Sequence, residues 1–284
     1  MRPHRFTFAA VLAALGTLAG AAPLSGPKTA PGTVVRWDGK DLDVCGRGAE
    51  EWPPLADACW YAFDLDAKAG SAIVWRQRGG RREEATVTLT AYPYPTQRLT
   101  VDERKVHPRK EDLARIERES AAVAKLWQIA GPARFTLPLA TPLAKLPTGG
   151  RFGARRIFNG EARSPHSGAD YAAPVGTPVL APADGTVVLA ADHFFSGKSV
   201  FLHHGGGLFS MSFHLSAIEV KTGDEVRRGQ RIGAVGATGR VTGPHLHFGL
   251  RWHGARVDPS QLLADPQGVA EIPRVTLPET NPPQ

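Results

Sequence analysis

The sequence predicts a mainly β protein in which two β domains are joined by a helix. Short runs rich in Val, Ile, Thr and aromatic residues recur in both halves of the chain, and Gly-containing turns separate them. One longer segment between the halves has helical periodicity instead. The 284 residues suffice for two ordinary domains. With 42% apolar and 21% charged residues, the composition is that of a globular protein and excludes a collagen-like, disulfide-dense or wholly disordered chain.

Residues 1–22 are predicted to be a signal peptide. A basic head containing Arg2 and Arg5 is followed by an apolar stretch and by small residues suited to cleavage after Ala21 or Ala22. The apolar stretch is shorter than the roughly 20 residues that span a bilayer, although an uncleaved anchor is the alternative. We therefore expect export to the periplasm, the cell wall or the extracellular space, with no stable transmembrane span in the mature chain.

Residues 23–108 are predicted to form an accessory domain that resembles a β-sandwich. Cys45 and Cys59 are the only cysteines, and an exported chain meets oxidising conditions, so we expect them to form a disulfide. Closing a loop of this length is worth about 3 kcal/mol in the chain-entropy treatment. The β-rich runs of this domain lie at 33–37, 59–65, 72–76 and 85–91.

Residues 109–131 are predicted to be a linker helix. Acidic residues at 111 and 112 favour its start through the helix dipole, and Gly131 followed by Pro132 favours its end. A single stripe at spacings of three and four predicts packing on one or both domains, and it is too short for a coiled coil. The stripe consists of Leu113, Ile116, Ser120, Val123, Trp127 and Ala130.

Residues 132–264 are predicted to form the second β domain, and residues 265–284 an extended or disordered Pro-rich tail. The net charge of +7 falls to +5 without Arg2 and Arg5. The basic residues are scattered, and no aromatic-interleaved basic motif is present, so we expect no nucleic-acid partner. An anionic cell-wall polymer suits the same charge.

Eight of the ten histidines lie between His166 and His253, and two short motifs stand out among them. His166 and Asp170 are four residues apart, but a Pro and a Gly nearby favour a loop that enters a strand. Taken alone, such a pair is more often a solvated loop feature. His245 and His247 alternate along a predicted strand, which places both side chains on one face. Two such imidazoles can flank one metal ion.

His214 ends another apolar strand and could bring a further imidazole to the same cleft, although a hydrogen-bonded structural role is more common for a lone histidine. His203 and His204 precede a glycine run, where a turn or strand-edge role is expected. His193 and His253 fall in predicted hairpin loops, where we expect solvated side chains.

Together and in this order, these motifs resemble the lysostaphin- and LytM-like zinc metallopeptidases over about residues 148–263. The resemblance rests on PHSGADYAAPVGTPVLAPADGTVV, on GQRIGAVGATGRVTGPHLHFG and on a later Val-Asp-Pro. It implies an antiparallel β catalytic domain with a groove, in which one zinc ion per chain is held by His166, Asp170 and His247. His214 and His245 would be the catalytic histidines. Three protein ligands leave a fourth position of the zinc open, as catalysis requires.

The resemblance also implies an exported endopeptidase, expected to be monomeric, that cuts peptide bonds in peptidoglycan cross-links or bridges. Arg155, Arg156 and Asn159 match a stretch near the family's groove and are expected substrate contacts. Ser212 replaces a tyrosine that many relatives carry, and Tyr171 or another group could supply the missing phenol. The role of the accessory domain stays open between positioning, wall binding and covering the groove.

Two alternatives remain. A non-catalytic relative could bind and activate a separate cell-wall amidase, but such regulators lack one or more ligands, and here all five positions are filled. A wall-binding structural module would leave the histidines without a role and would retain no zinc.

Overall fold

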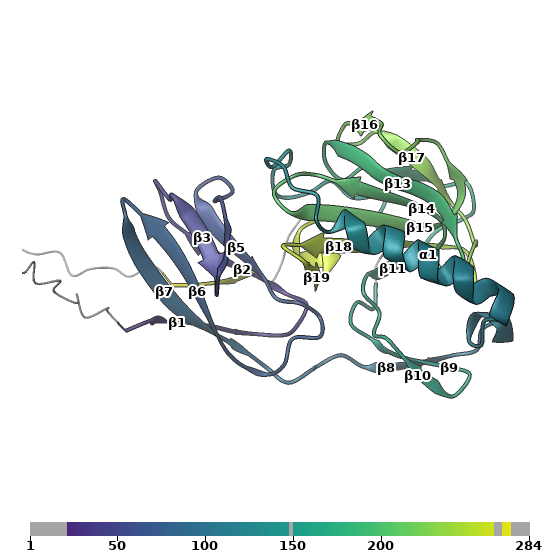
Figure 1. Cartoon of the computed structure of the whole chain (residues 1–284), viewed down its shortest axis with the longest axis horizontal. Helices are drawn as coiled ribbons and strands as arrows, with labels where there is room; N and C mark the ends of the chain where they lie inside the picture. The colour runs from purple at the N-terminus through teal and green to yellow at the C-terminus, as the bar shows by residue number, and fades with distance from the viewer. Residues whose placement is uncertain (1–21, 148–149, 264–268, 274–284) are drawn as a thin grey trace, which may run out of the picture.

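The computed structural model describes residues 22–147, 150–263 and 269–273, and it confirms a mainly β chain (Figure 1). The predicted signal peptide lies almost entirely outside the described residues. No described helix combines the length and the apolar character that crossing a bilayer would need.

Two facing sheets build the amino-terminal unit. The larger has the strand order β1-β7-β6-β3-β4, and the smaller has the order β20-β2-β5. Their apolar side chains meet in one cluster, and the predicted disulfide is present there, joining Cys45 in β3 to Cys59 in β5 across the two sheets. The strands are β1 Leu24–Thr29, β2 Val34–Asp38, β3 Val44–Arg47, β4 Glu50–Trp52, β5 Ala58–Ala62, β6 Gly70–Arg78, β7 Arg81–Leu89 and β20 Ala270–Glu271.

Strand β20 corrects the expectation that residues 265–284 form a tail, at least for the described residues 269–273. It pairs in parallel with β2, and the backbone N–H of Ile272 donates to the carbonyl of Arg36 at 2.8 Å. Ile272 is 2% exposed within the same apolar cluster as the disulfide. Burial of this side chain, together with the pairing of β20 with β2, holds this segment on the first unit.

A small third sheet links the two predicted domains. It contains β8 (Thr96–Leu99), β9 (Arg155–Phe158) and β10 (Glu161–Arg163), and β8 pairs in parallel with β9. Residues 96–99, which we expected within the accessory domain, therefore pair with a strand from the second unit. A short 3₁₀ helix, Glu103–Lys105, follows β8.

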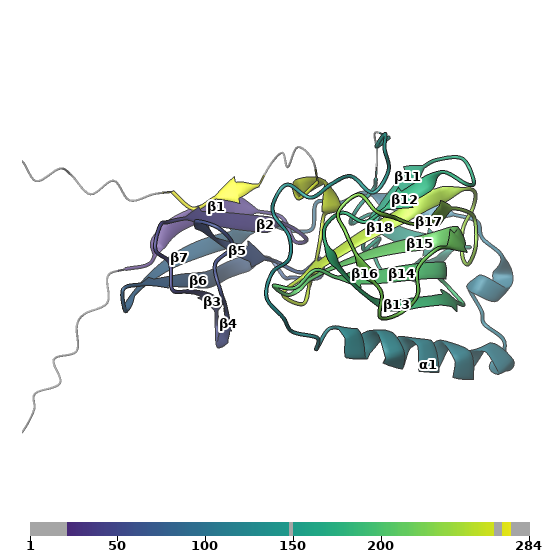
Figure 2. The ribbon, with the colours of Figure 1, turned by 90° about the horizontal axis from the view of Figure 1, so that it is seen from above.

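Helix α1 spans Lys110–Leu126, so it ends five residues before the predicted boundary. The predicted stripe is only partly correct, because Leu113 is 52% exposed, whereas Leu126, outside the stripe, is buried. Leu126 packs with Val123 and Trp127 against the apolar surface formed by Phe201, Phe209 and Met211. Figures 1 and 2 show the helix running along one face of the large carboxy-terminal sheet.

That nine-stranded sheet is the core of the second unit. Alternation along β18 puts Leu246, Phe248 and Leu250, each 0% exposed, on the core face and leaves His245 and His247 on the opposite face. Its strands are β11 Ala169–Ala172, β12 Pro178–Leu180, β13 Gly185–His193, β14 Gly197–His203, β15 Leu208–Ile218, β16 Glu225–Val226, β17 Arg231–Val235, β18 His245–Trp252 and β19 Ala255–Val257, followed by a 3₁₀ helix at Pro259–Gln261.

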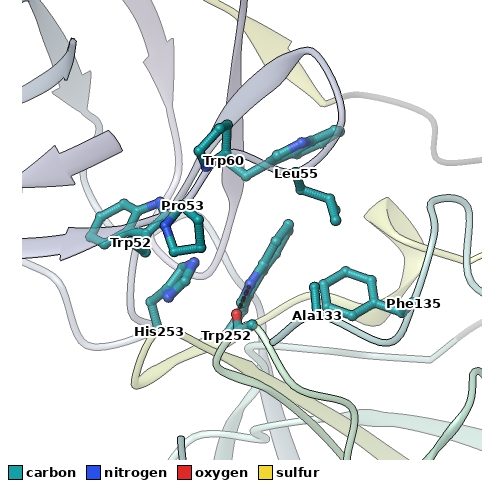
Figure 3. A pocket seen from close by; sticks show the side chains of 10 residues that line it. Trp52, Pro53, Leu55, Trp60, Ala133, Phe135, Trp252 and His253 are labelled. Carbon is teal, nitrogen blue, oxygen red and sulfur yellow. Dashed lines mark hydrogen bonds between the residues drawn. The ribbon is translucent and has the colours of Figure 1, made fainter. Parts of the chain in front are cut away.

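Aromatic stacking joins the two units. The ring of Trp52 stacks on His253 at 4.4 Å between centroids, and Trp60 lies 5.8 Å from Trp252 (Figure 3). The prediction that His253 is solvated was therefore wrong, because the loop that carries it faces the other unit. Burial lowers the pKa of His253 to about 4, with Arg47 contributing further.

An ion pair reinforces the same interface. Arg256 in β19 donates to both oxygens of Asp64 at 2.5 and 3.0 Å and to Asp66 at 2.6 Å. Burial by itself would raise the pKa of Asp64, but the hydrogen bonds from Arg256 outweigh it and lower that pKa to about 2.

We predict that Asp64→Asn lowers the free energy of unfolding by about 1–3 kcal/mol at pH 7, because a charge-assisted, half-buried contact is lost. The carboxylate stabilises the fold above its unfolded pKa of about 4, and this contribution disappears as pH falls toward 2. Denaturant unfolding should therefore show the two proteins converging at low pH. Glu219→Gln, which removes an exposed pair with Arg231, serves as the control and should change stability by less than about 1 kcal/mol. Equal stability of Asp64→Asn and the parent at pH 7 would contradict the assignment.

Candidate metal centre

The pairing of β11 with β18 brings the predicted ligands together. These antiparallel strands place Asp170 opposite His247 and Ala172 opposite His245, so both histidines share a face with the carboxylate. His166 precedes β11 in a loop whose backbone is fixed on both sides: its N–H donates to Ala154, and its carbonyl accepts from Gly153. The loop predicted for His166 and the shared face predicted for His245 and His247 are both present.

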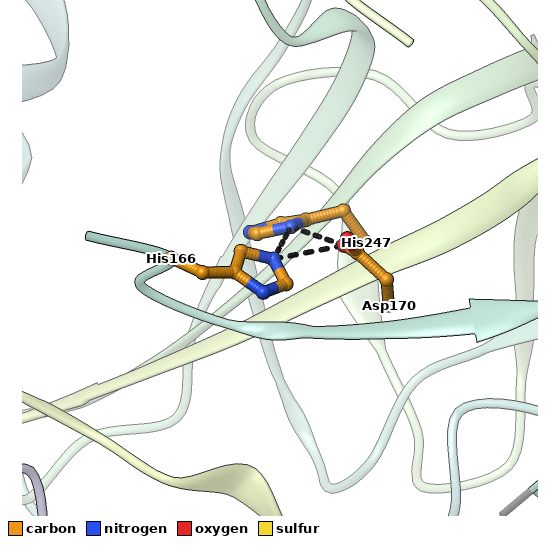
Figure 4. Close-up of side chains that lie close together, drawn as sticks. All are labelled: His166, Asp170 and His247. Atoms are coloured by element: carbon orange, nitrogen blue, oxygen red, sulfur yellow. Dashed lines mark hydrogen bonds and ion pairs between the residues drawn. The ribbon is translucent and has the colours of Figure 1, made fainter. Parts of the chain in front are cut away.

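Three atoms converge at this point (Figure 4). His166 Nε2 lies 2.9 Å from His247 Nδ1 and 2.9 Å from Asp170 Oδ1, and His247 Nδ1 lies 2.8 Å from the same oxygen. His166 and His247 are buried, at 2% and 7% exposure. The three side chains form the only cluster of metal-binding character in the part of the chain that the structure describes.

Hydrogen bonding determines which nitrogen of His166 is available. Its Nδ1 lies 2.9 Å from the carbonyl of Arg151, and a carbonyl can only accept, so Nδ1 carries the proton and Nε2 presents a lone pair. Burial lowers the pKa of His166 to about 4, which keeps the ring neutral at pH 7.

Arg156 neutralises the outer oxygen of the carboxylate. Its Nη2 donates to Asp170 Oδ2 at 2.6 Å, which leaves Oδ1 directed at the two histidines. Burial would raise the pKa of Asp170, but its close contacts with the imidazoles of His166 and His247 hold that pKa well below its usual range, so the group is a carboxylate.

This donor set fits a divalent metal ion. Two imidazole nitrogens and one carboxylate oxygen meet at a common point, an arrangement that a cation stabilises. His₂-carboxylate sets leave coordination positions open, as a catalytic rather than a structural ion requires.

His214 reaches the site through a β-bulge. Strand β15 pairs Ser212 with Val200 and then Leu215 with Lys198, so two residues oppose one. His214 has φ 64°, a left-handed conformation that a non-glycine residue adopts only under constraint. Simple alternation would point His214 into the core, and the bulge turns it to the face of His247 instead, where its ring centroid lies 4.9 Å from that of His245.

Backbone carbonyls set the proton positions of these two histidines as well. His214 Nδ1 donates to the carbonyl of Thr238, and His245 Nδ1 donates to that of Gly243, both at 2.9 Å. Each Nε2 therefore carries a lone pair, and that of His245 lies 3.6 Å from Asp170 Oδ1. Burial, followed by the nearby histidines, lowers the pKa of His214 to about 3.

Helix α1 covers part of this same face. A cavity of about 250 Å³ lies between the helix and the sheet, with Glu119, Ser167 and Phe213 among its walls. The Phe213 ring stacks on His247 at 5.2 Å between centroids, so the cavity adjoins the metal centre. His193, expected to be solvated, also lines the cavity; it is 7% exposed and hydrogen-bonds to Ser199 at 3.1 Å.

Two of the three expected substrate contacts, Arg156 and Asn159, form hydrogen bonds within the protein. Arg156 is paired with Asp170, as described above. The side-chain amide of Asn159 accepts a hydrogen bond from the backbone N–H of Val101 and donates to its carbonyl and to the Glu103 carboxylate. These bonds fix the segment after β8. Arg155 is exposed, and its guanidinium lies 4.9 Å from the ring of Tyr92. Of the three, Arg155 is the one whose side chain forms no hydrogen bond or ion pair within the described residues.

Tyr171 does not replace the missing family phenol. It lies opposite Leu246 on the core side of β11 and is 3% exposed within the main apolar cluster. Ser212 likewise lies opposite Phe248 and is 3% exposed. Neither residue faces His247, because alternation directs both away from the groove.

Several functional positions were missed from the sequence. The hydroxyl of Thr238 donates to the carbonyl of Leu215 and accepts from the N–H of Lys198, which holds Thr238 in place. Its carbonyl in turn orients the His214 ring by accepting from Nδ1. Gly168 admits the His247 ring, since a Cβ there would lie 2.6 Å from His247 Nε2. The Gly residues in HSG and ATG were the available signal, because glycine often marks a close approach.

The residues of this site lie within the part of the chain that matches a known family. Residues 164–259 match peptidase family M23. The peptidoglycan DD-endopeptidase ShyA of Vibrio cholerae is 47% identical over 108 residues, 38% of this chain and 25% of that protein. The DD-carboxypeptidase/endopeptidase Mpg of Neisseria meningitidis is 47% identical over 103 residues, 36% of this chain and 24% of that protein. The chain thus spans about a quarter of the length of these relatives.

A solved structure from Pseudomonas aeruginosa, described as a peptidase M23, covers more of the chain. It matches with a TM-score of 0.62 and 32% identity over 81% of this chain and 92% of that one. The fold and the His-Asp-His cluster define a metallopeptidase-like β protein. The chain belongs to peptidase family M23.

We predict that Gly168→Ala weakens binding of a divalent metal about 10- to 100-fold, because the added methyl group displaces His247. Titration with a metal-sensitive chelator measures this. Gly131→Ala is the control, since its Cβ would meet only His203 at 3.6 Å. Unchanged affinity in a folded Gly168→Ala protein would show that His247 is not a ligand.

Proposed function

We propose that this protein is an exported zinc metalloendopeptidase that hydrolyses peptide bonds in peptidoglycan. The observation that carries the proposal is the convergence of His166, Asp170 and His247 beside two further histidines whose Nε2 lone pairs are free. The DD-endopeptidase named among the relatives supports the substrate class. The basic surplus of the chain suits an anionic polymer.

In the proposed assignment, His166 Nε2, His247 Nδ1 and Asp170 Oδ1 hold one zinc ion per chain. When bound, zinc supplies an activated water and polarises the amide carbonyl. Arg156 holds Asp170 so that a single oxygen faces the ion. The carbonyl of Arg151 keeps His166 in the tautomer that can bind.

His214 and His245 carry the protons. Each has its Nδ1 proton fixed on a carbonyl, so each can accept a proton at Nε2 and later return it. After accepting, the ring becomes a cation that can hydrogen-bond the developing oxyanion or protonate the leaving amine. The two rings differ in surroundings: His214 is buried and constrained, whereas His245 lies nearer to Asp170.

We predict that His247→Ala lowers bound zinc from about one ion per chain to near zero, because one of three ligands is lost. Elemental analysis after dialysis measures this loss. Full retention of zinc would remove His247 from the ligand set.

His245→Ala should keep its zinc and lose at least about 100-fold in kcat/KM, because a proton-transfer group is removed without touching a ligand. Metal analysis and peptide hydrolysis are measured on the same preparation. Loss of zinc together with activity would reassign His245 as a ligand.

The deciding experiment incubates the zinc-loaded chain from residue 23 onward with purified sacculi and identifies the released fragments by mass spectrometry. New amino termini, absent with His245→Ala, are expected and would name the bond. Intact sacculi together with full zinc occupancy would refute the endopeptidase and favour a regulator of a separate hydrolase.

A further inference from the structure

Arg240 lies in the loop between β17 and β18, and its guanidinium contacts the same Phe158 ring as that of Arg156, the arginine that pairs with Asp170. The backbone N–H of Arg240 donates to the carbonyl of Phe195 at 2.8 Å, and Thr238, two residues earlier, accepts from His214. The loop therefore couples the position of Arg240 to that of a proposed catalytic histidine. Among the residues the structure describes, no carboxylate forms an ion pair with Arg240.

Two aromatic rings hold the guanidinium in place. Its Cζ lies 4.7 Å from the ring centroid of Phe158 and 4.7 Å from that of Phe195. Phe158 is 2% exposed and so forms a fixed wall. Rings contact the guanidinium through their faces and satisfy little of its hydrogen-bonding capacity.

Most N–H groups of Arg240 are therefore free for a ligand. A guanidinium has five N–H donors, and the one described hydrogen bond is a long contact of 3.4 Å from Nη1 to the carbonyl of Lys105. The side chain is only half-buried, which leaves it accessible. A preorganised guanidinium with free donors is well suited to a carboxylate, which it can bind through two parallel hydrogen bonds.

The surrounding charges leave a positive surplus. Arg156 and Arg163 are neighbours of Arg240, and each already has its own carboxylate, Asp170 and Glu161 respectively. Burial and then these two arginines lower the pKa of Arg240 to about 10, so the side chain stays charged at pH 7 while its cationic form is less favoured than in water. An anion that binds here relieves that penalty.

We propose that Arg240 binds a free carboxylate of the substrate, on the residue whose amine is released. This inference rests on the proposed peptidoglycan endopeptidase function. At a bond between two D-amino acids in a cross-link, the carboxyl of the acyl-side residue is the scissile carbonyl itself, so only the amine-side residue can carry a free carboxylate next to the cut. A glycine bridge has none there, because each glycine carboxyl is already in an amide. Arg240 thus selects D,D cross-links over glycine bridges.

The test uses two soluble cross-linked stem peptides that differ in one group. The residue whose amine is released carries a free carboxylate in one peptide and a carboxamide in the other. The zinc-loaded parent should cut the carboxylate with a kcat/KM about 10- to 100-fold higher. In Arg240→Gln the ratio of the two kcat/KM values should fall to near one, because only the peptide with the free carboxylate is cut more slowly. Arg231→Gln, which changes an exposed arginine paired with Glu219, should keep the parental ratio.

Equal cutting of both peptides by the parent would leave the endopeptidase intact and refute the carboxylate site. Equal slowing of both peptides in Arg240→Gln would also refute it, since a structural role acts on both. If the parent cuts neither peptide, the proposed function fails, and calorimetric binding of the two amine-side peptides then decides the role of Arg240.

In that binding arm, a preference for the carboxylate that Arg240→Gln abolishes supports the site, and equal affinities refute it. Arg240→Lys keeps the charge but loses the paired donors, so it should retain part of the preference. This variant also keeps the proposal testable if Arg240→Gln does not fold.

Discussion

The metal centre depends on one strand register. Because β11 pairs antiparallel with β18, Asp170 lies opposite His247, and a slip of β11 by one residue would point Asp170 into the core, away from His247. The apolar residues that alternate with the ligands, Tyr171 and Leu246, are both buried and oppose such a slip. The same hydrophobic burial that folds the sheet therefore specifies the distance between the ligands, and Gly168 leaves the room that His247 needs.

Backbone carbonyls are the second organising feature. The rings of His166, His214 and His245 each present Nδ1 to a carbonyl, on Arg151, Thr238 and Gly243. A carbonyl can only accept a hydrogen bond, so each of the three rings carries its proton on Nδ1. Neutral backbone groups therefore set the tautomer, and no charged side chain is needed at Nδ1. The arrangement leaves the Nε2 lone pairs of all three rings free of backbone hydrogen bonds and makes Asp170 the carboxylate that His166 and His245 approach.

The sequence supports much of this site but not its geometry. Alternation along a strand was enough to place His245 and His247 on one face, and the motif order indicated the family. The position of His214 could not be read in this way, because it depends on a bulge that breaks the alternation on which such reasoning rests. The role of Arg156 was also hidden, since an arginine that neutralises a buried carboxylate and one that awaits a substrate have the same local sequence. Strand β20 was missed because two residues carry too little pattern, and Pro-rich surroundings favoured a tail.

The return of the chain to its starting unit changes how the whole protein is connected. β1 and β20 lie near the two ends of the described chain, and both belong to the amino-terminal unit, with Ile272 in its core. The metal-binding unit is therefore an insertion between β7 and β20, tethered at both of its ends. A single linker allows a domain to twist about one axis, whereas two tethers restrict such rotation. A chain that ended at residue 264 would lack Ile272, a core residue of the first unit. The large apolar cluster of the second unit also includes Val34 and Ala62 of the first, so the two units depend on each other in folding.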